Sequence, residues 1–286
     1  MEPIEKEPAI NYFPGHMNKA LYQIKDTVHN ADAAILILDS RAPLASFPYG
    51  LEKIIGDKPK VILLSKRFEY TGIAISMPGI LNEDHSSAFI TGKLAFLSNC
   101  PLKERLEEIK GCKVTIENDG RCATWAELGF GNLIHSKNAL VVVLGTYIGM
   151  GIVIDHKVYE GSHLLAGEYS DAHMDTEKTF KNTMATCFGK DGLERATGLT
   201  GKELFDHLDD ERVYAGFNKY CQNLAWMLNN LQLLLDVDTI LIGGGISAQP
   251  KLIDCIKENM KGLTQWFPTL EEPVIKACKF NNDANL

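Results

Sequence analysis

The chain has 286 residues, of which 45% are apolar and 23% charged, and this composition is typical of a globular protein with a large core. Its formal net charge of −8 argues against a general binder of nucleic acids or membrane surfaces. No stretch approaches the roughly 18 apolar residues of a transmembrane helix, and the acidic start from Met1 to Glu7 is unlike a signal peptide. We therefore expect a cytoplasmic protein.

Seven cysteines are scattered along the chain, and no two of them form a C-x-x-C pair. In a cytoplasmic protein this spacing is typical of reduced thiols in the core. We therefore expect neither disulfide bonds nor a structural zinc site.

The first predicted elements alternate between helix and strand. Apolar residues recur at helical spacing over residues 17–30, and the continuous apolar run AAILILD at 33–39 predicts a buried strand that ends at Asp39. Residues 49–56 predict a short helix, and KVILL at 60–64 predicts a second buried strand.

The connection after this second strand is unusually short. Only eight residues separate Val61–Leu64 from the next apolar strand, Ile73–Ser76. A parallel pair needs a crossover of about a dozen residues or more, so an ordinary βαβ unit is excluded. Either the two strands form a hairpin, or two segments of different origin meet at Arg67–Tyr70.

Beyond this point strands and helices continue to alternate, which predicts an α/β protein with a mixed sheet. The strand segments are 72–79, 113–119, 139–161 (which holds a glycine loop between strands) and 239–247, and the helices are 101–111, 121–130 and 216–235.

Glu117-Asn118-Asp119 follows a predicted buried strand, at the edge where open α/β sheets bind ligands. A carboxylate there can accept the proton of a substrate hydroxyl, and the neighbouring amide can orient that hydroxyl. The alternative is that Asn118 and Asp119 only cap the helix that begins near Arg121. The residues alone favour the cap.

Two glycine-rich segments are candidates for a nucleotide site. Gly145–Gly151 joins two strands and adds the hydroxyl of Thr146, while Gly243–Gly245 follows a strand and permits close approach of a planar ligand. The alternatives are a tight hairpin and a strand-to-helix turn. Tyr147 and Met150 are bulky for a loop against phosphate, which favours the hairpin.

Four blocks between about Gly72 and Leu286 resemble the ROK family of repressors, open reading frames and sugar kinases. They are GIAISMPG, VTIENDGRCATWAEL, LGTYIGMGIVIDHKVYEGSHLLAGE and ILIGGGIS, in family order. The resemblance implies the ribonuclease-H-like, actin-type ATPase fold with two lobes. It also implies a hexokinase- or glucokinase-like transfer of phosphate from ATP, with Mg²⁺, to a sugar hydroxyl. The expected partner is a small-molecule sugar, with no nucleic acid and no membrane, and a homodimer is expected by analogy.

The same resemblance assigns roles to residues of this chain. It makes Asp119 the general base. The substrate-binding residues are Asn118, Glu168 and Gly79, and the nucleotide- and phosphate-binding residues are Gly145, Thr146, Gly149, Gly243, Gly244 and Gly245.

Three features depart from the family pattern. Tyr147 and Met150 interrupt a phosphate loop that normally reads G-T-G-I-G-G-G, and Asp171 stands where the family often has His. Only His173 and Cys187 fall where the family's zinc cluster lies, which indicates a zinc-free branch.

The front of the chain departs further, because the family's D-x-G-G-T motif, which supplies Mg²⁺ and phosphate contacts, is absent from these 286 residues. Residues 10–66 instead resemble the start of circularly permuted ribosome-assembly GTPases. However, Ser65-Lys66-Arg67-Phe68 replaces N-K-x-D, and neither G-x-x-x-x-G-K-[ST] nor D-x-x-G occurs.

We therefore expect a chimera-like organisation. Residues 1–69 form an α/β segment resembling a GTPase opening, and residues 70–286 form a ROK-type region that lacks the family's final helix. Three functions remain open: a sugar kinase with impaired activity, a non-catalytic sugar-binding or interaction protein, and, least favoured, a GTPase fragment.

Overall fold

A computed structural model describes residues 34–39, 60–66, 69–70, 72–174, 182–263 and 271–281. Within it the chain forms two compact units. The first takes in the described residues up to Ile75 with 92–94 and Pro101–Ile116, and the second comprises Ser76–Thr91, Ala95–Cys100 and the chain from Glu117 onward. The helices predicted at 17–30 and 49–56 lie outside the described residues.

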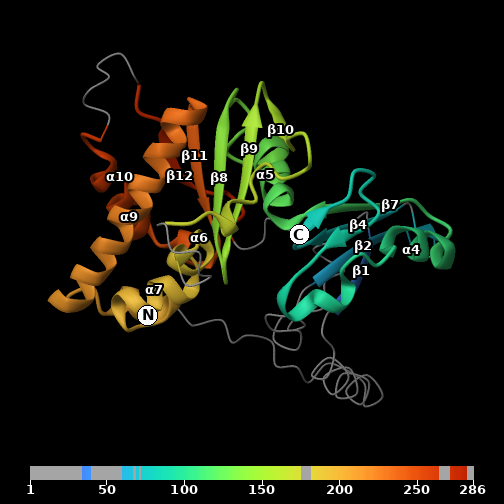
Figure 1. Ribbon diagram of the computed structural model, residues 1–286, viewed down its shortest axis with the longest axis horizontal. Helices are drawn as coiled ribbons and strands as arrows, with labels where there is room; N and C mark the ends of the chain where they lie inside the picture. Colours follow the sequence, from blue (N-terminus) through green and yellow to red (C-terminus); the bar gives the residue numbers. More distant parts are fainter. Residues whose placement is uncertain are drawn as a thin grey trace, which may run out of the picture. The chain divides into compact units, whose positions relative to one another are not determined.

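The first unit is built on a mixed sheet (Figure 1). Its strands, in the order β1-β2-β4-β7 with β3 paired to β2, are β1 (Ala34–Asp39), β2 (Lys60–Lys66), β3 (Glu69–Tyr70), β4 (Ile73–Met77) and β7 (Val114–Asn118). The helix α4 (Leu102–Lys110) precedes β7 and is capped at its C-terminus by Gly111, whose φ of 64° suits glycine. The last residues of β4 and β7 belong to the second unit.

The short connection after β2 is an antiparallel one. Strand β2 pairs antiparallel with β3, with Ser65 opposite Tyr70, and it also pairs antiparallel with β4, with Ile62 opposite Ala74. Antiparallel neighbours need no crossover helix, so eight residues suffice. Of the two alternatives from the sequence, the observed strand geometry is therefore the hairpin.

The second unit contains a mixed sheet in the order β10-β9-β8-β11-β12. Its strands are β8 (Ala139–Leu144), β9 (Ile148–Ile154), β10 (Lys157–Tyr159), β11 (Thr239–Gly243) and β12 (Val274–Ala277). The first three are antiparallel neighbours in sequence order, and β11 is parallel to both β8 and β12. The mixed α/β sheet predicted from the sequence is confirmed.

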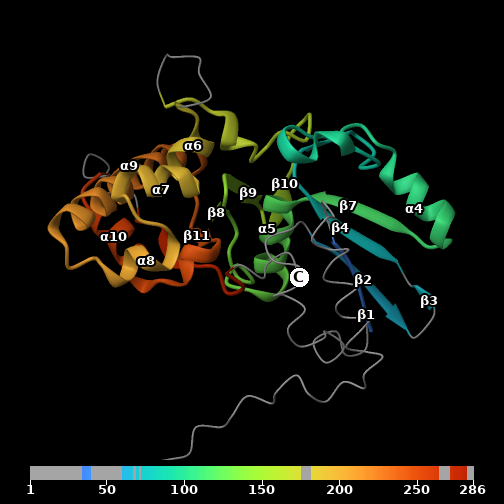
Figure 2. The same cartoon turned by 90° about the horizontal axis from the view of Figure 1, so that it is seen from below.

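Both faces of this sheet are buried, which explains the unbroken apolar run of β8. Leu140 and Val142 face one core together with residues of the long helix α9 (Glu211–Leu235). Ala139 and Val141 face a second core with Leu128 of α5 (Asp119–Phe130). Figures 1 and 2 show α5 on one side and α9 with α10 (Pro250–Met260) on the other. Strands buried on both faces read as continuous apolar segments.

Smaller elements complete the second unit. They are β5 (Ile80–Leu81), β6 (Ala88–Phe89), η3 (Tyr169–Asp171), α6 (Met184–Phe188), α7 (Lys190–Thr197), α8 (Gly201–Asp206) and η5 (Gly245–Ala248), while η2 (Gly92–Leu97) has residues in both units. Among the described helices, none combines the length and apolar character needed to cross a bilayer.

Candidate functional site

Asn118 is the helix cap that the sequence alternative predicted. Its side-chain Oδ1 accepts hydrogen bonds from the backbone N–H groups of Gly120 (2.8 Å) and Arg121 (3.2 Å), which the first turn of α5 leaves free. The amide oxygen of Asn118 thus caps the helix. The amide nitrogen faces the candidate site.

The amide nitrogen of Asn118 joins three parts of the chain. Nδ2 donates to Oε1 of Glu168 at 2.8 Å and to the carbonyl oxygen of Gly79 at 3.2 Å. All three predicted substrate-binding residues therefore meet at one point. Because both Nδ2 hydrogens are engaged, a hydroxyl that bound Asn118 would have to replace one of these partners.

Gly79 contributes through its backbone. Its φ is 109°, a region that side chains disfavour, and an added Cβ would lie 2.5 Å from the carbonyl oxygen of Phe89. Glycine is therefore required at this turn after β4, and the turn directs its own carbonyl oxygen at Asn118.

Asp119, the predicted base, is the first residue of α5. Its Oδ1 accepts the N–H of Gly120 at 2.9 Å, and its side chain keeps an exposed face. The surrounding protein nevertheless raises the pKa of this carboxyl, because partial desolvation disfavours the charged form more than the backbone hydrogen bonds favour it. A carboxylate with a raised pKa and an open face is suited to accept a proton.

Glu168 is half-buried at the end of the loop that follows β10. Burial, first of all, raises the pKa of its carboxyl to about 7, and the charges of Asp119 and Asp171 act in the same direction while Arg121 opposes them. Near neutral pH this group therefore exists in both protonation states, and it can donate or accept a hydrogen bond.

Behind these groups lies an ion pair that the sequence did not single out. The side chain of Arg121 is 1% exposed, and its Nε lies 2.7 Å from Oε1 of Glu117. The same oxygen accepts the N–H of Asn118 at 2.8 Å. Their i,i+4 spacing was a visible signal, but such a pair at a helix start is usually a solvated one.

Strand β9 brings the first glycine segment next to α5. Gly120 packs on the backbone of Met150, since an added Cβ would lie 2.9 Å from its N and O atoms, and Gly149 lies beside the Cα of Gly120. The side chain of Met150 is buried in the core, so it does not obstruct the loop. The prediction that the bulky Met150 crowds a phosphate-binding loop was wrong. The loop is shorter than expected and ends before β9 begins at Ile148.

The turn itself is Gly145-Thr146-Tyr147, between β8 and β9, and all three residues are exposed. Gly145 uses its N–H within the turn, donating to the carbonyl oxygen of Tyr147 at 2.9 Å. In the described part of the chain the hydroxyl of Thr146 has no partner. Thr146 is thus the donor that an incoming phosphate could use.

The second glycine segment lies at the same end of the sheet. Gly243 is opposite Val143 in the parallel pair β11–β8, so the carboxyl ends of both strands coincide. Gly244 has a φ of 90°, and a Cβ there would overlap the carbonyl oxygen of Leu144. Gly245, by contrast, has open space around it. The carboxyl ends of neighbouring parallel strands are where such sheets bind ligands.

The residues fit a nucleotide better than a metal ion bound by protein alone. Among the described residues, no group of three or more His, Cys, Asp or Glu side chains could hold a metal. Mg²⁺ usually binds through substrate phosphates with one or two carboxylates, so an incoming triphosphate would have to supply most of its ligands here. His173 pairs with Thr183 by a backbone bridge, and Cys187 lies in α6.

The arrangement defines the class of the protein: an α/β chain with a polar cluster at one helix start and two glycine segments at one sheet end. Comparison gives the family, because the ROK family model matches residues 60–286. This chain belongs to the ROK family. The match includes β2, which the sequence analysis had placed with the preceding segment.

Two curated relatives are sugar kinases by name. A β-glucoside kinase from Listeria innocua is 30% identical over 244 residues, covering 79% of this chain and 80% of that protein. An N-acetylmannosamine kinase from Haemophilus influenzae is 24% identical over 232 residues, covering 77% and 75%.

Solved structures agree on the fold. A ROK family protein from Streptococcus pneumoniae, in complex with sucrose, has a TM-score of 0.67 at 27% identity and covers 77% of this chain and 78% of its own. A ROK family glucokinase from Streptomyces griseus, in complex with glucose and AMPPNP, has a TM-score of 0.66 at 19% identity and covers 86% and 83%. The predicted actin-type ATPase fold is therefore confirmed.

Proposed function

We propose that this chain transfers the γ-phosphoryl group of ATP to a hydroxyl of a hexose. The observation that carries the proposal is the cluster of Asp119, Asn118 and Glu168 at the start of α5, beside β9 and its glycine turn. Relatives named as kinases of β-glucosides and N-acetylmannosamine support the sugar as acceptor.

Asp119 has the role of general base. Its carboxyl accepts the proton of the attacking hydroxyl while the new oxygen–phosphorus bond forms and ADP departs. Because the surroundings raise the pKa of this carboxyl, its affinity for a proton is greater than that of an ordinary Asp. Its exposed face leaves room for the hydroxyl to approach.

Glu168 binds the sugar, and Asn118 holds Glu168 in place. The bond from Nδ2 of Asn118 occupies one carboxyl oxygen, Oε1. The other oxygen is the one assigned to a sugar hydroxyl. Gly79 completes the cluster by fixing the orientation of the Asn118 amide.

The nucleotide is assigned to the glycine segments. The hydroxyl of Thr146 suits a phosphate oxygen, and the open space at Gly245 suits the adenosine. Gly149, which the resemblance also assigns to phosphate, lies in β9 opposite Val143, next to the turn. Mg²⁺ bound together with ATP would be held largely by the phosphates of the nucleotide, and it would supply positive charge against the negative charge that develops during the transfer. The absence of D-x-G-G-T removes one expected set of phosphate contacts, so we expect slow turnover.

The same absence favours a second candidate, a sugar-binding protein that does not consume ATP. The two functions differ in product, so ³¹P NMR of Mg-ATP mixed with glucose, N-acetylmannosamine or a β-glucoside distinguishes them. A sugar-phosphate resonance with one of these sugars supports the kinase. Calorimetric binding of a sugar without that resonance supports the second function and overturns the first.

A further inference from the structure

Arg121 is a buried cation at a position where the helix dipole disfavours positive charge. Arg121 is in the first turn of α5, where the helix dipole favours negative charge, yet its side chain is 1% exposed. Positions that break a local rule in this way are expected at functional or strained sites. Glu117 neutralises its charge, but neutralisation alone does not explain why a cation is buried here.

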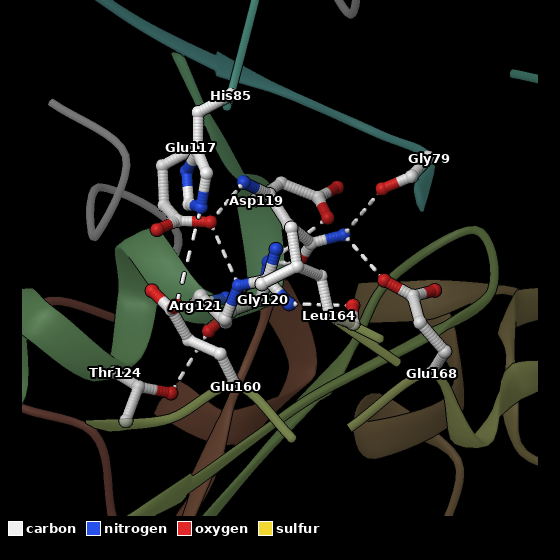
Figure 3. A network of polar contacts seen from close by, with 11 residues as sticks. Gly79, His85, Glu117, Asp119, Gly120, Arg121, Thr124, Glu160, Leu164 and Glu168 are labelled. Carbon is white, nitrogen blue, oxygen red and sulfur yellow. Dashed lines mark hydrogen bonds and ion pairs between the residues drawn. The ribbon is translucent and has the colours of Figure 1, made fainter. Parts of the chain in front are cut away.

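The contacts of the guanidinium give the reason. Nε donates to Glu117 at 2.7 Å, and Nη1 donates to the backbone carbonyl oxygen of Leu164 at 3.0 Å (Figure 3). Nη2 is buried and has no partner among the described residues. One side chain therefore connects the end of β7 and the start of α5 with a segment more than forty residues further along the chain.

That segment is loop 160–168, which runs from the end of β10 to Glu168. It contains three residues of positive φ: Gly161 (77°), Leu164 (57°) and Gly167 (91°). Of these three residues, Leu164 is not a glycine, so a positive φ is unfavourable for it. A residue keeps such a conformation only where the surrounding structure holds it. The bond from Arg121 falls on this residue's own carbonyl oxygen.

The far end of the loop is held by close packing instead. A Cβ on Gly167 would lie 2.5 Å from the carbonyl oxygen of Met150 in β9. Within the loop, the N–H of Ala166 donates to the carbonyl oxygen of Glu160, and the N–H of Glu168 donates to that of Leu165, both at 3.1 Å. Besides the bond from Asn118 to Glu168 at the last residue of the loop, the side chain of Arg121 connects the loop to the helix bearing Asp119.

We propose that Arg121 is a positioning residue, which holds loop 160–168 against the start of α5 so that Glu168 stays within hydrogen-bond distance of Asn118. Its consequence for sugar binding rests on the proposed function. The mechanical part does not, because it concerns only contacts within the chain.

The charge of Arg121 has a second effect on the same carboxyl. Burial, Asp119 and Asp171 all raise the pKa of Glu168, and the Arg121 cation lowers it. Glu117 partly screens that cation. Loss of the positive charge therefore leaves more Glu168 protonated at neutral pH, whereas loss of the hydrogen bonds alone does not.

Two substitutions separate these effects. Arg121→Lys keeps the positive charge but replaces the guanidinium fork, whose Nε and Nη1 bond Glu117 and Leu164, with a single nitrogen. Arg121→Met loses both charge and bonds. Glu117→Gln with Arg121→Met removes the stranded carboxylate, should the single Met variant fail to fold. The readouts are amide hydrogen exchange at Ala166 and Glu168, and the ¹³C NMR titration of the Glu168 carboxyl, assigned with Glu168→Gln.

In Arg121→Lys we expect exchange at the two loop amides to rise about tenfold or more, as for the loss of a charged hydrogen bond. The pKa of Glu168 should remain close to the wild-type value. In Arg121→Met the same exchange increase should come with a higher Glu168 pKa, while amides of α9 remain as protected as before. Unchanged loop exchange in the folded variants overturns the proposal.

The outcome also stands apart from the proposed function. If the wild-type chain binds no sugar but the loop responds as expected, the kinase and sugar-binding proposals fail and the positioning role remains. If sugar binds and the loop amides do not respond, the positioning role of Arg121 fails and the sugar-binding part of the proposed function remains.

Discussion

Asn118 donates its side-chain amide to Glu168, fifty residues further along the chain, at an N···O distance of 2.8 Å. The carbonyl oxygen of the same amide caps α5. The cap and the site contact, which sequence reasoning treated as alternatives, are therefore two halves of one side chain. A substitution can remove either half separately.

Asn118→Asp keeps the cap and removes the donor. The new carboxylate still accepts from Gly120 and Arg121, but it faces Glu168 without a hydrogen to share. Where Glu168 is ionised, we expect a loss of about 1–3 kcal/mol in the free energy of unfolding, because its half-buried carboxylate and the carbonyl oxygen of Gly79 lose their donor and a like charge is added. Urea unfolding at a pH above the pKa of Glu168 measures this.

The matched control is Asn118→Ser, which caps through its hydroxyl but does not add charge. If both variants are as stable as the wild type, the contact with Glu168 contributes nothing. A difference between the Ser and Asp variants measures the effect of the added charge.

The free energy of unfolding should depend on pH because the pKa of Glu168 is raised in the folded protein. Burial raises the pKa of its carboxyl to about 7 in the folded chain, from an ordinary value of 4.5. Between these values the folded state binds more protons than the unfolded one, so this group's contribution to stability is present at low pH and lost as pH rises toward 7. Glu168→Gln cannot ionise and should remove that loss.

The difference in unfolding free energy between Glu168→Gln and the wild type, followed from about pH 4 to about pH 8, tests this. We expect the difference to shift in favour of the Gln variant as pH rises. A pH-independent difference would mean that the carboxyl titrates normally.

Gly244 and Gly245 separate folding from ligand binding. Gly244→Ala places a Cβ onto the carbonyl oxygen of Leu144 at a φ of 90°, and should cost about 1–3 kcal/mol in stability from strain alone. Gly245→Ala enters open space and should leave stability within about 0.5 kcal/mol. If the adenosine lies there, Gly245→Ala weakens ATP binding in calorimetry. Unchanged affinity removes Gly245 from the nucleotide site.

Much of the second unit could be predicted from its sequence. The sequence predicted the strand β8, the helix at 121–130 and the long helix α9. Helical periodicity and continuous burial determine which positions are apolar, so these elements can be recognised from residue types. The predicted boundaries were less accurate. Helix α9 begins at Glu211 rather than at 216, because Asp210 caps it, and the apolar periodicity used for the prediction does not reveal this cap.

The candidate site was readable only in part. The residues of its cluster were named from family blocks, but the burial of Arg121 was not, because a charged residue at a helix start ordinarily faces water. The bond to Leu164 depends on a loop conformation with positive φ at a leucine, which residue type does not reveal. Met150 was misjudged for a similar reason: its strand pairing decides which way the side chain points.

The central claim is that Asp119 is the base of a sugar kinase. Asp119→Asn keeps the acceptor for the N–H of Gly120 and removes the proton acceptor, so the fold and the sugar site should survive. The measurement is ADP release from Mg-ATP, with and without each sugar of the panel, in wild type and variant, alongside calorimetric sugar affinity. We predict slow, sugar-dependent release that falls at least about a hundredfold in Asp119→Asn with affinity nearly unchanged. Equal rates in the two proteins, release that needs no sugar, or sugar binding without any release in the wild type would contradict the claim.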